Sequence, residues 1–581
     1  MLKISELEIM RIIFLVVILS LSISVNDLAQ TESHHTRTIC NPLNLSYRYM
    51  PDTPSRREAA DPSIIMFRDD YYLFASKSGG YWWSHDLVDW NLIETNQILT
   101  EDYAPTVVAI DDTLYFLASS SKKCPVLKSG DPKSGCWQIA RDSLPFTLTD
   151  PCFFLDGDSH LYLYWGCSPS DPIHGIELNP KTFDPIGTPQ NFILADTKNR
   201  GWENPGDENE LKQPPWIEGP SMNKFNGKYY LQYAAPGTEY KSYADGVYSS
   251  DSPLGPFTYA PVNPFSYKPG GFICGAGHGS TTKDRYGNYW HIATMTISVL
   301  HKFERRIGLF PASLDQDGNL IADAGITDRP IIIPDHKFSH TNELSPGWML
   351  LSYRKPTRAS STLENFPSQN AVDENVRTSW CAISNARDEW IMVDLGTTYT
   401  IRALQINYSD HGTKIYSRDT SCYYQYIVES SIDMKSWKNI VDKTNVKSDS
   451  PHDYVQLSGT VKARYVRLKN KHVPDGLFSV SDFRIFGIGS GKKPALVRSL
   501  KAVRYIHDRR IVNVSWIKSV GATGYTIRFG QDKITMLYSY PVYTDTCMTL
   551  RSLNIHDSYY FSIDSFNENG ISVSKAIQKI Q

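Results

Sequence analysis

The segment Asp61-Pro-Ser-Ile-Ile-Met-Phe-Arg-Asp-Asp-Tyr-Tyr-Leu-Phe-Ala-Ser76 is the first of five related segments in the first 310 residues of this 581-residue chain. Each segment has a small or polar start, a short apolar run, a turn rich in Asp, Gly or Asn, and a second run of aromatic and apolar residues. Two such runs joined by a turn are typical of a β-hairpin. A hairpin that returns every few tens of residues predicts a propeller or a similar array. The other four segments begin at Ala104, Asp150, Glu218 and Gly277.

Three of the five segments carry a carboxylate at what we take to be one equivalent position: Asp61, Asp150 and Glu218. Equivalent positions of successive blades face one axis, so the sequence predicts that these side chains converge at one end of a central channel. Convergent carboxylates fit glycoside hydrolysis, in which an inverting enzyme holds a base and an acid roughly 6.5–9.5 Å apart. A third carboxylate would keep the acid protonated by like-charge repulsion. Asp-Pro also opens ordinary turns. All three carboxylates, however, occur in phase with the repeat, which favours the catalytic interpretation.

The composition of the chain favours a carbohydrate partner. The formal net charge is −3, and there are 35 Tyr and 13 Trp. So small a net charge argues against nucleic acid or an anionic membrane surface as the main partner. Aromatic side chains suit the faces of sugar rings, although β-rich folds use many aromatic residues in any case.

An apolar run at residues 12–24 predicts a signal peptide, because it is too short to span a bilayer comfortably. Glu6 and Glu8 are unusual before such a run, so Met10 is a better initiator than Met1. We expect residues 1–30 to be the signal peptide. We also expect the protein to be exported, periplasmic or secreted, with no membrane insertion after cleavage.

Nine cysteines make an odd number, so at least one thiol of an exported chain is unpaired. Cys124 and Cys136 bracket a short polar loop and are spaced for a local disulfide. Cys152 and Cys167 lie in the two runs of one hairpin, where a disulfide and two free thiols are equally compatible with the sequence. No CxxC pair is present, which argues against a structural zinc site.

The chain divides into regions of different pattern. Residues 31–48 look like a loose lead-in, and residues 50–325 contain the five repeats. Residues 350–489 and 495–581 each have the alternating strands of a β-sandwich. The predicted fold class is therefore all-β, with a five-bladed β-propeller followed by two β-sandwich domains.

Two resemblances support the sandwich assignments. Residues 350–489 resemble a factor V/VIII type C (discoidin-like) domain, through Ala371-Val-Asp-Glu-Asn-Val-Arg-Thr-Ser-Trp380 and Glu389-Trp-Ile-Met-Val-Asp-Leu-Gly396. Many carbohydrate-binding modules share that fold. Asp373 matches a loop that often holds structural calcium in relatives, and a turn-forming Asp explains it at least as well. Residues 495–581 resemble a fibronectin type III-like domain, through Asn513-Val-Ser-Trp516 and Gly524-Tyr-Thr-Ile-Arg528.

The first 310 residues closely resemble glycoside hydrolase family 43, a family of inverting enzymes with a five-bladed β-propeller. The resemblance implies that Asp61 is the general base, Glu218 the general acid, and Asp150 the residue that tunes the pKa of the acid. It implies an exported enzyme that removes terminal pentose from arabinose- or xylose-containing plant glycans. We favour an α-L-arabinofuranosidase over a β-xylosidase or a galactofuranosidase. A non-catalytic glycan-binding protein is the alternative, although it predicts a broken carboxylate set.

The same resemblance assigns further residues near the substrate. His278 matches a channel histidine that often contacts calcium, directly or through water, and a histidine hydrogen-bonded to water fits equally well; calcium is thus the possible cofactor. One of Arg305 and Arg306 is expected to face the pocket, and Arg306 is our choice by a small margin.

Aromatic side chains are the other candidates for the sugar pocket. Trp216, two residues before Glu218, is a candidate subsite wall. Trp82 or Trp83 is a second candidate wall, whereas Trp90 fits the core of the first blade better. Tyr103 precedes the second repeat, which has no carboxylate, and is expected to line the pocket instead.

Overall fold

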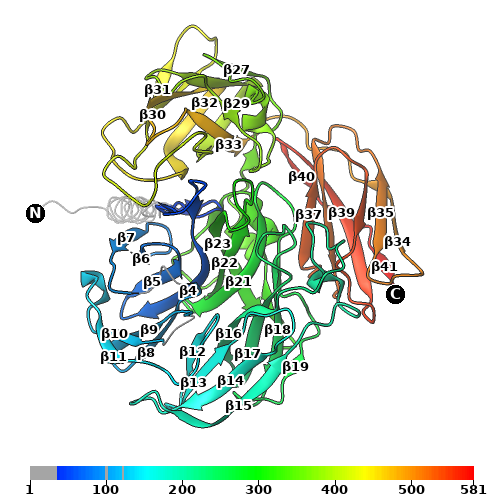
Figure 1. Ribbon diagram of the computed structural model, residues 1–581. Helices are drawn as coiled ribbons and strands as arrows, with labels where there is room; N and C mark the ends of the chain where they lie inside the picture. Colours follow the sequence, from blue (N-terminus) through cyan, green and yellow to red (C-terminus); the bar gives the residue numbers. More distant parts are fainter. Residues whose placement is uncertain (1–35, 99–102, 121–123) are drawn as a thin grey trace, which may run out of the picture. The chain divides into compact units, whose positions relative to one another are not determined.

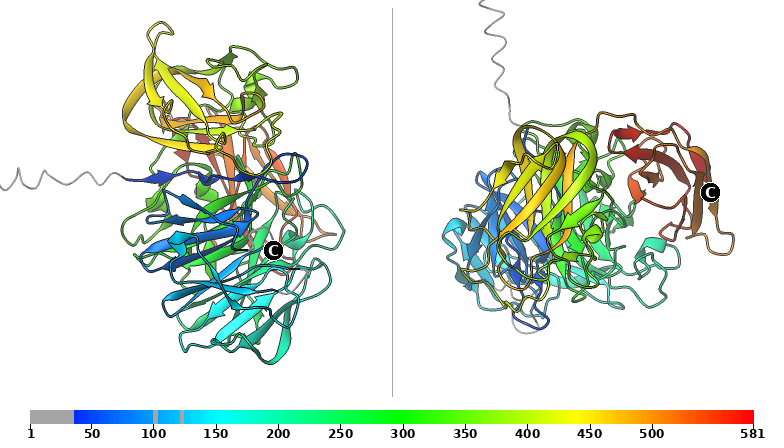
Figure 2. Two further views of the ribbon diagram at one scale, coloured as in Figure 1. Left: turned by 60° about the vertical axis from the view of Figure 1, so that its left-hand side comes forward. Right: turned by 90° about the horizontal axis from the view of Figure 1, so that it is seen from above.

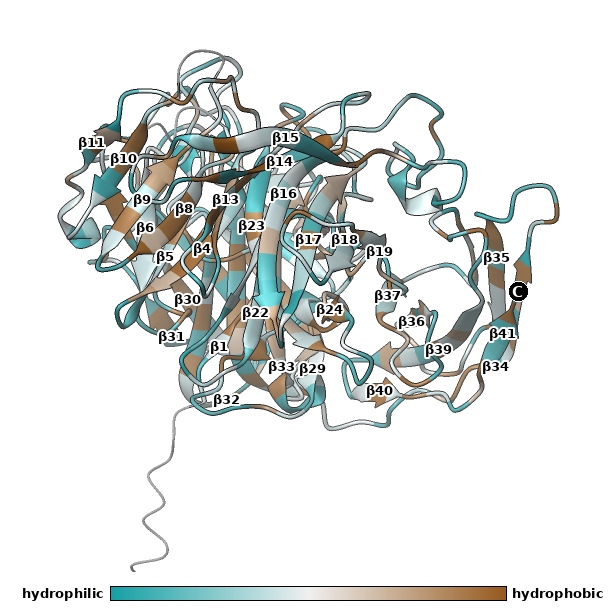
Figure 3. Ribbon diagram, turned by 90° about the horizontal axis from the view of Figure 1, so that it is seen from below, coloured by the Kyte–Doolittle hydropathy of each residue, from teal (hydrophilic) through white to brown (hydrophobic). Residues whose placement is uncertain are grey.

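The computed structural model describes residues 36–98, 103–120 and 124–581. The predicted signal peptide at residues 1–30 lies outside these ranges. The described chain consists of β-strands, loops and five short 3-10 turns, and residues 38–581 form one compact unit (Figure 1). Hydrophilic and hydrophobic residues alternate along many strands (Figure 3), as expected when one face of a sheet is buried. No helix within the described ranges has the length and hydropathy needed to cross a membrane.

The first region contains five blades of antiparallel strands (Figure 1), and a single parallel pairing of Ala244 with Ala276 joins blades four and five in one sheet. The first strands of neighbouring blades contact one another in the cyclic order β4, β8, β12, β16, β21 and back to β4. Ser280 joins blades five and one, because its hydroxyl accepts the Ile64 N–H and donates to the Pro62 carbonyl. The blades are β4 (Ala60–Phe67), β5 (Asp70–Ser76), β6 (Gly80–Ser84) and β7 (Asn91–Glu94); β8 (Thr106–Ile110), β9 (Thr113–Leu117), β10 (Val126–Ser129) and β11 (Gln138–Arg141); β12 (Cys152–Leu155), β13 (Leu161–Trp165), β14 (Ile173–Leu178) and β15 (Pro185–Ile193); β16 (Glu218–Phe225), β17 (Lys228–Ala235), β18 (Ala244–Ser250) and β19 (Thr258–Tyr259), with β20 (Ser266–Tyr267) also pairing to β18; and β21 (Cys274–Lys283), β22 (Tyr289–Thr296), β23 (Arg305–Leu314) and β24 (Leu320–Ala322).

The predicted loose lead-in is wrong for the part that the structure describes. β1 (Thr38–Ile39) pairs with β25 (Ile331–Ile332), and the hairpin β2 (Arg48–Tyr49) and β3 (Arg57–Glu58) follows. Tyr47 is fully buried, and the Asn41 amide exchanges hydrogen bonds with the backbone of Leu309 in blade five. This segment runs between the propeller and the second domain (Figure 2), so its apolar residues serve as core.

The second domain is built on one eight-stranded sheet with a core around Trp380. Register shifts interrupt the pairing of its two long strands between Asp394 and Tyr399, and such irregularities bend a sheet. Asp373 accepts hydrogen bonds from the Asn375 N–H and the Thr378 hydroxyl, which is the turn-forming role. The strands are β26 (Met349–Leu350), β27 (Thr357–Ala359), β28 (Trp380–Cys381), β29 (Trp390–Tyr408), β30 (Gln425–Ser431), β31 (Lys438–Asp442), β32 (His452–His472) and β33 (Ser479–Ile488).

The third domain consists of two sheets, with strand orders β34-β35-β38 and β37-β36-β39-β40, and β41 pairs with β39. Its core is continuous with that of blade four, because Trp516 and Tyr525 belong to the same buried cluster as Trp202 and Tyr233. The likeness to fibronectin type III domains stays a prediction. The strands are β34 (Arg498–Arg504), β35 (Val512–Ile517), β36 (Gly524–Gly530), β37 (Tyr538–Val542), β38 (Cys547–Leu550), β39 (Tyr559–Asn567), β40 (Gly570–Ser572) and β41 (Gln578–Ile580).

No disulfide joins any of the nine cysteines, all of which lie in the described ranges, so the Cys124–Cys136 disulfide for which the sequence is spaced does not form. Cys124 is buried and Cys136 is exposed, which places the two side chains in different environments. Cys152 and Cys167 follow the free-thiol alternative.

Candidate active site

One backbone conformation recurs at the start of all five blades. The residues that adopt it have φ angles between 45° and 59°, in the left-handed region that most side chains avoid. They are Asp61, Ala104, Asp150, Gly219 and His278. The five residues define the equivalent position of the repeat, and Glu218 lies one residue before it.

The strand pairing confirms this offset. Ala60, Glu218 and Gly277 each pair with the end of the neighbouring strand, and each is followed by the same register shift. Our assumption that Glu218 is equivalent to Asp61 and Asp150 is therefore wrong by one residue. A Cβ atom at Gly219 would lie 2.5 Å from the His278 ring, so glycine makes room for that ring. Blade four thus supplies its carboxylate from the preceding residue.

Hydroxyl groups of neighbouring blades hold the equivalent positions in place. In three blades the backbone N–H of the left-handed residue donates to a Ser or Thr within two residues of the end of the preceding blade's second strand. These hydrogen bonds join Asp61 to Thr294 at 2.8 Å, Ala104 to Ser76 at 2.7 Å, and Asp150 to Ser119 at 2.8 Å. They fix the backbone from which the carboxylates project.

Asp61 is a buried carboxylate that faces two basic groups. Its oxygens accept hydrogen bonds from Ser76 Oγ at 2.6 Å and from Arg305 Nη1 at 3.1 Å, and His278 Nδ1 lies 3.3 Å from Oδ1. Burial alone would raise the pKa of Asp61. The charges of Arg305 and His278 outweigh that cost and hold the pKa below its ordinary value. Asp61 is therefore ionised at neutral pH.

Arg305, not Arg306, faces the site, so our choice between the two was wrong. Arg305 bonds Asp61 and, through Nη2 at 2.6 Å, the buried carboxylate of Glu58. Arg306 points to the other face of β23, as adjacent residues of a strand must. Its Nε–H donates to His452 Nε2 in the second domain at 2.7 Å, and its Nη1 donates to the Arg57 carbonyl.

Glu218 is buried, and no lysine or arginine among the described residues forms an ion pair with it. Oε1 accepts a short hydrogen bond from the Tyr243 hydroxyl, and Oε2 lies 3.2 Å from Cys167 Sγ, which donates to it. Burial raises the pKa of Glu218, and the charge of His278 only partly opposes that effect. The side chain therefore favours its protonated form at higher pH than an exposed glutamate does.

Asp150 lies next to Glu218. Oxygens of these two carboxylates and Cys167 Sγ all lie within 4.8 Å of one another. Asp150 Oδ2 accepts the Gly219 N–H at 3.3 Å and lies 3.7 Å from His278 Nδ1. Burial, reinforced by the charges of Glu218 and Asp61, raises the pKa of Asp150 to about 7.

His278 lies between the carboxylates of Asp61 and Asp150. Its backbone N–H donates to Asp245 Oδ1 at 2.7 Å. Burial would lower its pKa, but Asp61, Asp150 and Glu218 together raise it, so the ring favours the imidazolium form. Calcium prefers oxygen ligands, so the imidazole would meet such an ion through water rather than directly. Calcium at His278 stays a prediction.

The aromatic candidates lie in different places. The Tyr103 ring lies 5.8 Å from the Phe303 ring and 5.8 Å from the Arg305 guanidinium, which puts it beside the site. Trp216 is 44% exposed, close to Glu218 in sequence. Trp82 is buried in the core of blade one, so it cannot form a pocket wall. The Trp83 ring stacks against the Lys133 ammonium at 3.9 Å, and its contacts do not include the carboxylates. Trp90 packs against the core, as expected.

Comparison with known proteins assigns the propeller to a family. Residues 55–320 match the sequence model "Glycosyl hydrolases family 43", and residues 356–480 match "F5/8 type C domain". The propeller is a family 43 glycosyl hydrolase domain. The matched ranges agree with the resemblances that the sequence suggested, and residues 356–480 are correspondingly an F5/8 type C domain.

The similar proteins are distant. A non-reducing end alpha-L-arabinofuranosidase of Bacteroides ovatus is 23% identical over 386 residues, which is 60% of this chain and 64% of that protein. A xylosidase/arabinosidase of Butyrivibrio fibrisolvens is 27% identical over 48% of this chain and 58% of its own length. The chain thus spans less than two thirds of these relatives. A solved thermostable family-43 glycoside hydrolase aligns over 52% of this chain and all of its own, with 22% identity and a TM-score of 0.43.

Proposed function

We propose that the protein is an exported, inverting glycoside hydrolase that removes terminal pentose residues from plant polysaccharides or oligosaccharides, most favourably as an α-L-arabinofuranosidase. The family 43 domain and the names of the relatives support the class of reaction and the choice of pentose. The observation that carries the proposal is the opposite electrostatics of two buried carboxylates in one site. The pKa of Asp61 is lowered and that of Glu218 is raised. Such a pair divides the roles of base and acid.

Asp61 acts as the general base in this proposal. Its ionised carboxylate takes a proton from a water molecule as that water attacks the anomeric carbon from the face opposite the leaving group. Arg305 keeps Asp61 ionised, and the Ser76 hydroxyl fixes the carboxylate plane. Both contacts also hold the side chain in one orientation before substrate binds, which lowers the entropic cost of the transition state.

Glu218 acts as the general acid and gives its proton to the glycosidic oxygen as the bond breaks. Tyr243 and Cys167 orient its carboxyl group. Asp150 lies beside it, and like-charge repulsion between the two carboxyl groups disfavours the state in which both are ionised. The imidazolium of His278 lies between Asp61 and Asp150 and partly neutralises the anions that the site collects.

The proposal is tested with chromogenic and natural substrates. The purified protein should release pentose from a 4-nitrophenyl α-L-arabinofuranoside, and NMR of the first product should show the anomer of inverted configuration. Glu218→Gln should lose hydrolysis of arabinan and arabinoxylan while keeping the fold and the binding of product. Glu177→Gln, the same change on an outer strand of blade three, is the matched control and should keep full activity.

The other members of the proposal are distinguished in the same assay. Preference for a β-xyloside or a galactofuranoside would make the protein a β-xylosidase or a galactofuranosidase. If the wild-type protein binds glycan but hydrolyses none of these substrates, it is a glycan-binding protein and the enzymatic proposal is wrong. A signal peptide would show as a mature N-terminus near residue 30 when the full chain is expressed in a secreting host.

A further inference from the structure

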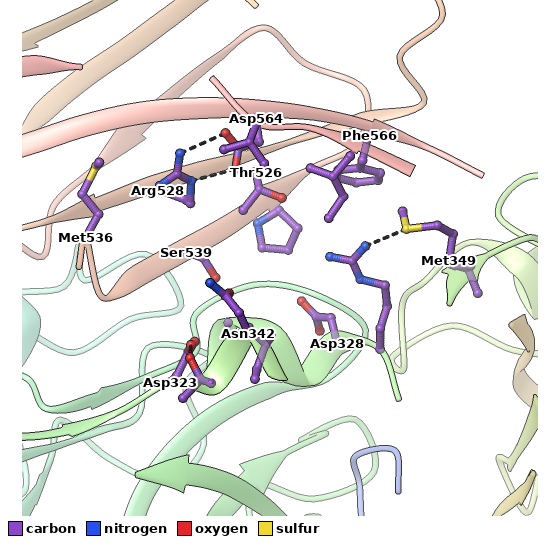
Figure 4. A pocket seen from close by; sticks show the side chains of 18 of the residues that line it. Asp323, Asp328, Asn342, Met349, Thr526, Arg528, Met536, Ser539, Asp564 and Phe566 are labelled. Carbon is purple, nitrogen blue, oxygen red and sulfur yellow. Dashed lines mark hydrogen bonds and ion pairs between the residues drawn. The ribbon is translucent and has the colours of Figure 1, made fainter. Parts of the chain in front are cut away.

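A cavity of 640 Å³ lies where the propeller and the two sandwich domains meet, apart from the carboxylate site. Its lining includes residues 323–329 after blade five, residues 349–355 of the second domain and residues 523–543 of the third (Figure 4). A volume of this size is typical of binding sites for small molecules. Such sites bury most of the surface of their ligand, and many of them lie between domains. None of the lining residues contacts Asp61, Asp150 or Glu218.

Most of the charged groups that line the cavity already have a partner. The pairs are Arg528 with Asp564 at 2.7 Å, Lys355 with Glu568 at 3.3 Å, Glu374 with Arg484 at 2.7 Å, and Asp328 with Lys268 at 2.6 Å. Asp323 accepts a hydrogen bond from the Thr341 hydroxyl, and burial raises its pKa toward the neutral form. These groups therefore leave little uncompensated charge in the cavity.

Arg329 is the exception among the described lining residues. Its guanidinium makes one polar side-chain contact, from Nη1 to the thioether sulfur of Met349 at 3.0 Å, and it forms no ion pair with any described residue. Thioether sulfur is a weak acceptor, so the other N–H donors of this group are available to a ligand in the cavity. Arg329 is half-buried, so its guanidinium gives up part of its hydration without gaining a paired counter-charge, which costs free energy. A carboxylate ligand would remove that cost through paired N–H···O bonds.

The rest of the lining defines what carries that carboxylate. Asn342, Thr526 and Ser539 present neutral polar groups (Figure 4), which suit hydroxyl groups. Tyr353 and Tyr543 lie with ring centroids 4.2 Å apart, and they supply aromatic surface beside the polar groups. We infer that this cavity binds an acidic sugar of monosaccharide size, with its carboxylate on Arg329 and its hydroxyl groups on the neutral polar side chains.

The test measures binding to the full chain by calorimetry and by thermal unfolding. D-glucuronate is the probe, while D-glucose and acetate supply the sugar ring and the carboxylate separately. We expect D-glucuronate to bind and to raise Tm at concentrations where glucose and acetate do neither. An equal response to acetate would reduce the site to a simple anion site. An equal response to glucose would remove the role of Arg329. No response to any probe would make the cavity a gap between domains; each of these outcomes overturns the inference.

Variants locate the binding in the cavity. Arg329→Met should lower the affinity for D-glucuronate at least tenfold, with hydrolysis of the chromogenic pentoside unchanged as the check on folding. Lys355→Met removes a cation that is already paired with Glu568, so this matched control should keep the affinity.

If Arg329→Met does not fold, Arg329→Lys keeps the charge but loses the planar fork, and it should weaken binding as well. Unchanged affinity in the Arg329 variant that folds would contradict the inference, as would loss of affinity in Lys355→Met. Because the pentoside assay is read separately, failure here and failure of the proposed hydrolase activity are distinguishable.

Discussion

Asp61 and Glu218, on the two sides of the carboxylate site, are similarly buried, but their pKa values are shifted in opposite directions. On one side Asp61 is buried against the Arg305 guanidinium, which is itself paired with Glu58. On the other side Glu218 is buried against a phenol and a thiol, which donate hydrogen bonds but carry no charge at neutral pH. Burial raises the pKa of a carboxylic acid unless a nearby cation compensates for the lost hydration. The placement of one arginine therefore determines which carboxylate is the base.

The largest expected effect comes from removing either carboxylate, and the choice of substrate distinguishes the two sides. Asp61→Asn and Glu218→Gln should each lower kcat/KM for a natural glycan by about 10²–10⁴-fold, the usual contribution of general acid–base catalysis. With a 4-nitrophenyl leaving group, which departs without protonation, Glu218→Gln should recover most of its activity. Asp61→Asn should not recover, because attack of water is still unassisted. Equal losses on both substrates in both variants would contradict the division of roles.

Arg305→Met tests the cation itself and is expected to have the next largest effect. Because Asp61 must be ionised, activity falls as the pH drops through its pKa. Loss of Arg305 should raise that pKa, so the acidic limb of the kcat/KM profile should move to higher pH. Arg306→Met is the matched control on the neighbouring residue. It should leave the limb in place but lower stability by about 1–3 kcal/mol, since His452 and the Arg57 carbonyl lose their donor. A shift of the limb in Arg306→Met instead would reverse our correction.

The sequence was enough to predict the repeat and the carboxylates but not their surroundings. Five hairpins in phase predicted the propeller, because a β-hairpin pattern is local and appears in each segment. The offset of Glu218 was visible as well: aligning Pro62, Pro105, Pro151 and Pro220 places Gly219, not Glu218, opposite Asp61. The alternation of β23 likewise shows that only one of Arg305 and Arg306 can face the site, but the sequence does not say which.

Other contacts had no signal in the sequence. Tyr243 and Cys167 reach Glu218 from two other parts of the propeller, and their distance along the chain hides the contact. The hydrophobic residues of the lead-in around Tyr47 follow neither a helix nor a strand period, so the sequence predicts a loop there. The segment is buried only because blade five and the second domain pack against it. Ser76 and Ser119 end the first two repeats with the same Ala-Ser pair, and that recurrence is a signal which could have identified the interblade hydrogen bonds.

Asp150→Asn is expected to have a smaller effect on activity than the changes above. Unlike Arg306→Met, it is expected to raise stability at alkaline pH. Removing the negative charge beside Glu218 should lower the pKa of Glu218, so the basic limb of the kcat/KM profile should move to lower pH. The pKa of Asp150 is raised from 3.8 to about 7 in the folded protein. A raised pKa means that stability is lost as the pH rises from the unfolded value through the folded one. At pH 8 the Asn variant should therefore have a higher free energy of unfolding than the wild type, by a few kcal/mol at about 1.4 kcal/mol per pKa unit, and a higher Tm. A lower Tm at pH 8 would contradict the raised pKa.

Cys167→Ala should give the smallest effect and test the uncharged side of the comparison. The thiol donates to Glu218 Oε2 at 3.2 Å, and a hydrogen bond to a carboxylate favours its ionised form. Losing that donor should raise the pKa of Glu218, so the basic limb should move to higher pH by a fraction of a unit. Cys167→Ser restores a donor and should return the limb toward its wild-type position, a rescue that a merely structural cysteine would not produce. If Ala and Ser give the same profile, the thiol acts only by packing, and Tyr243 alone orients the acid.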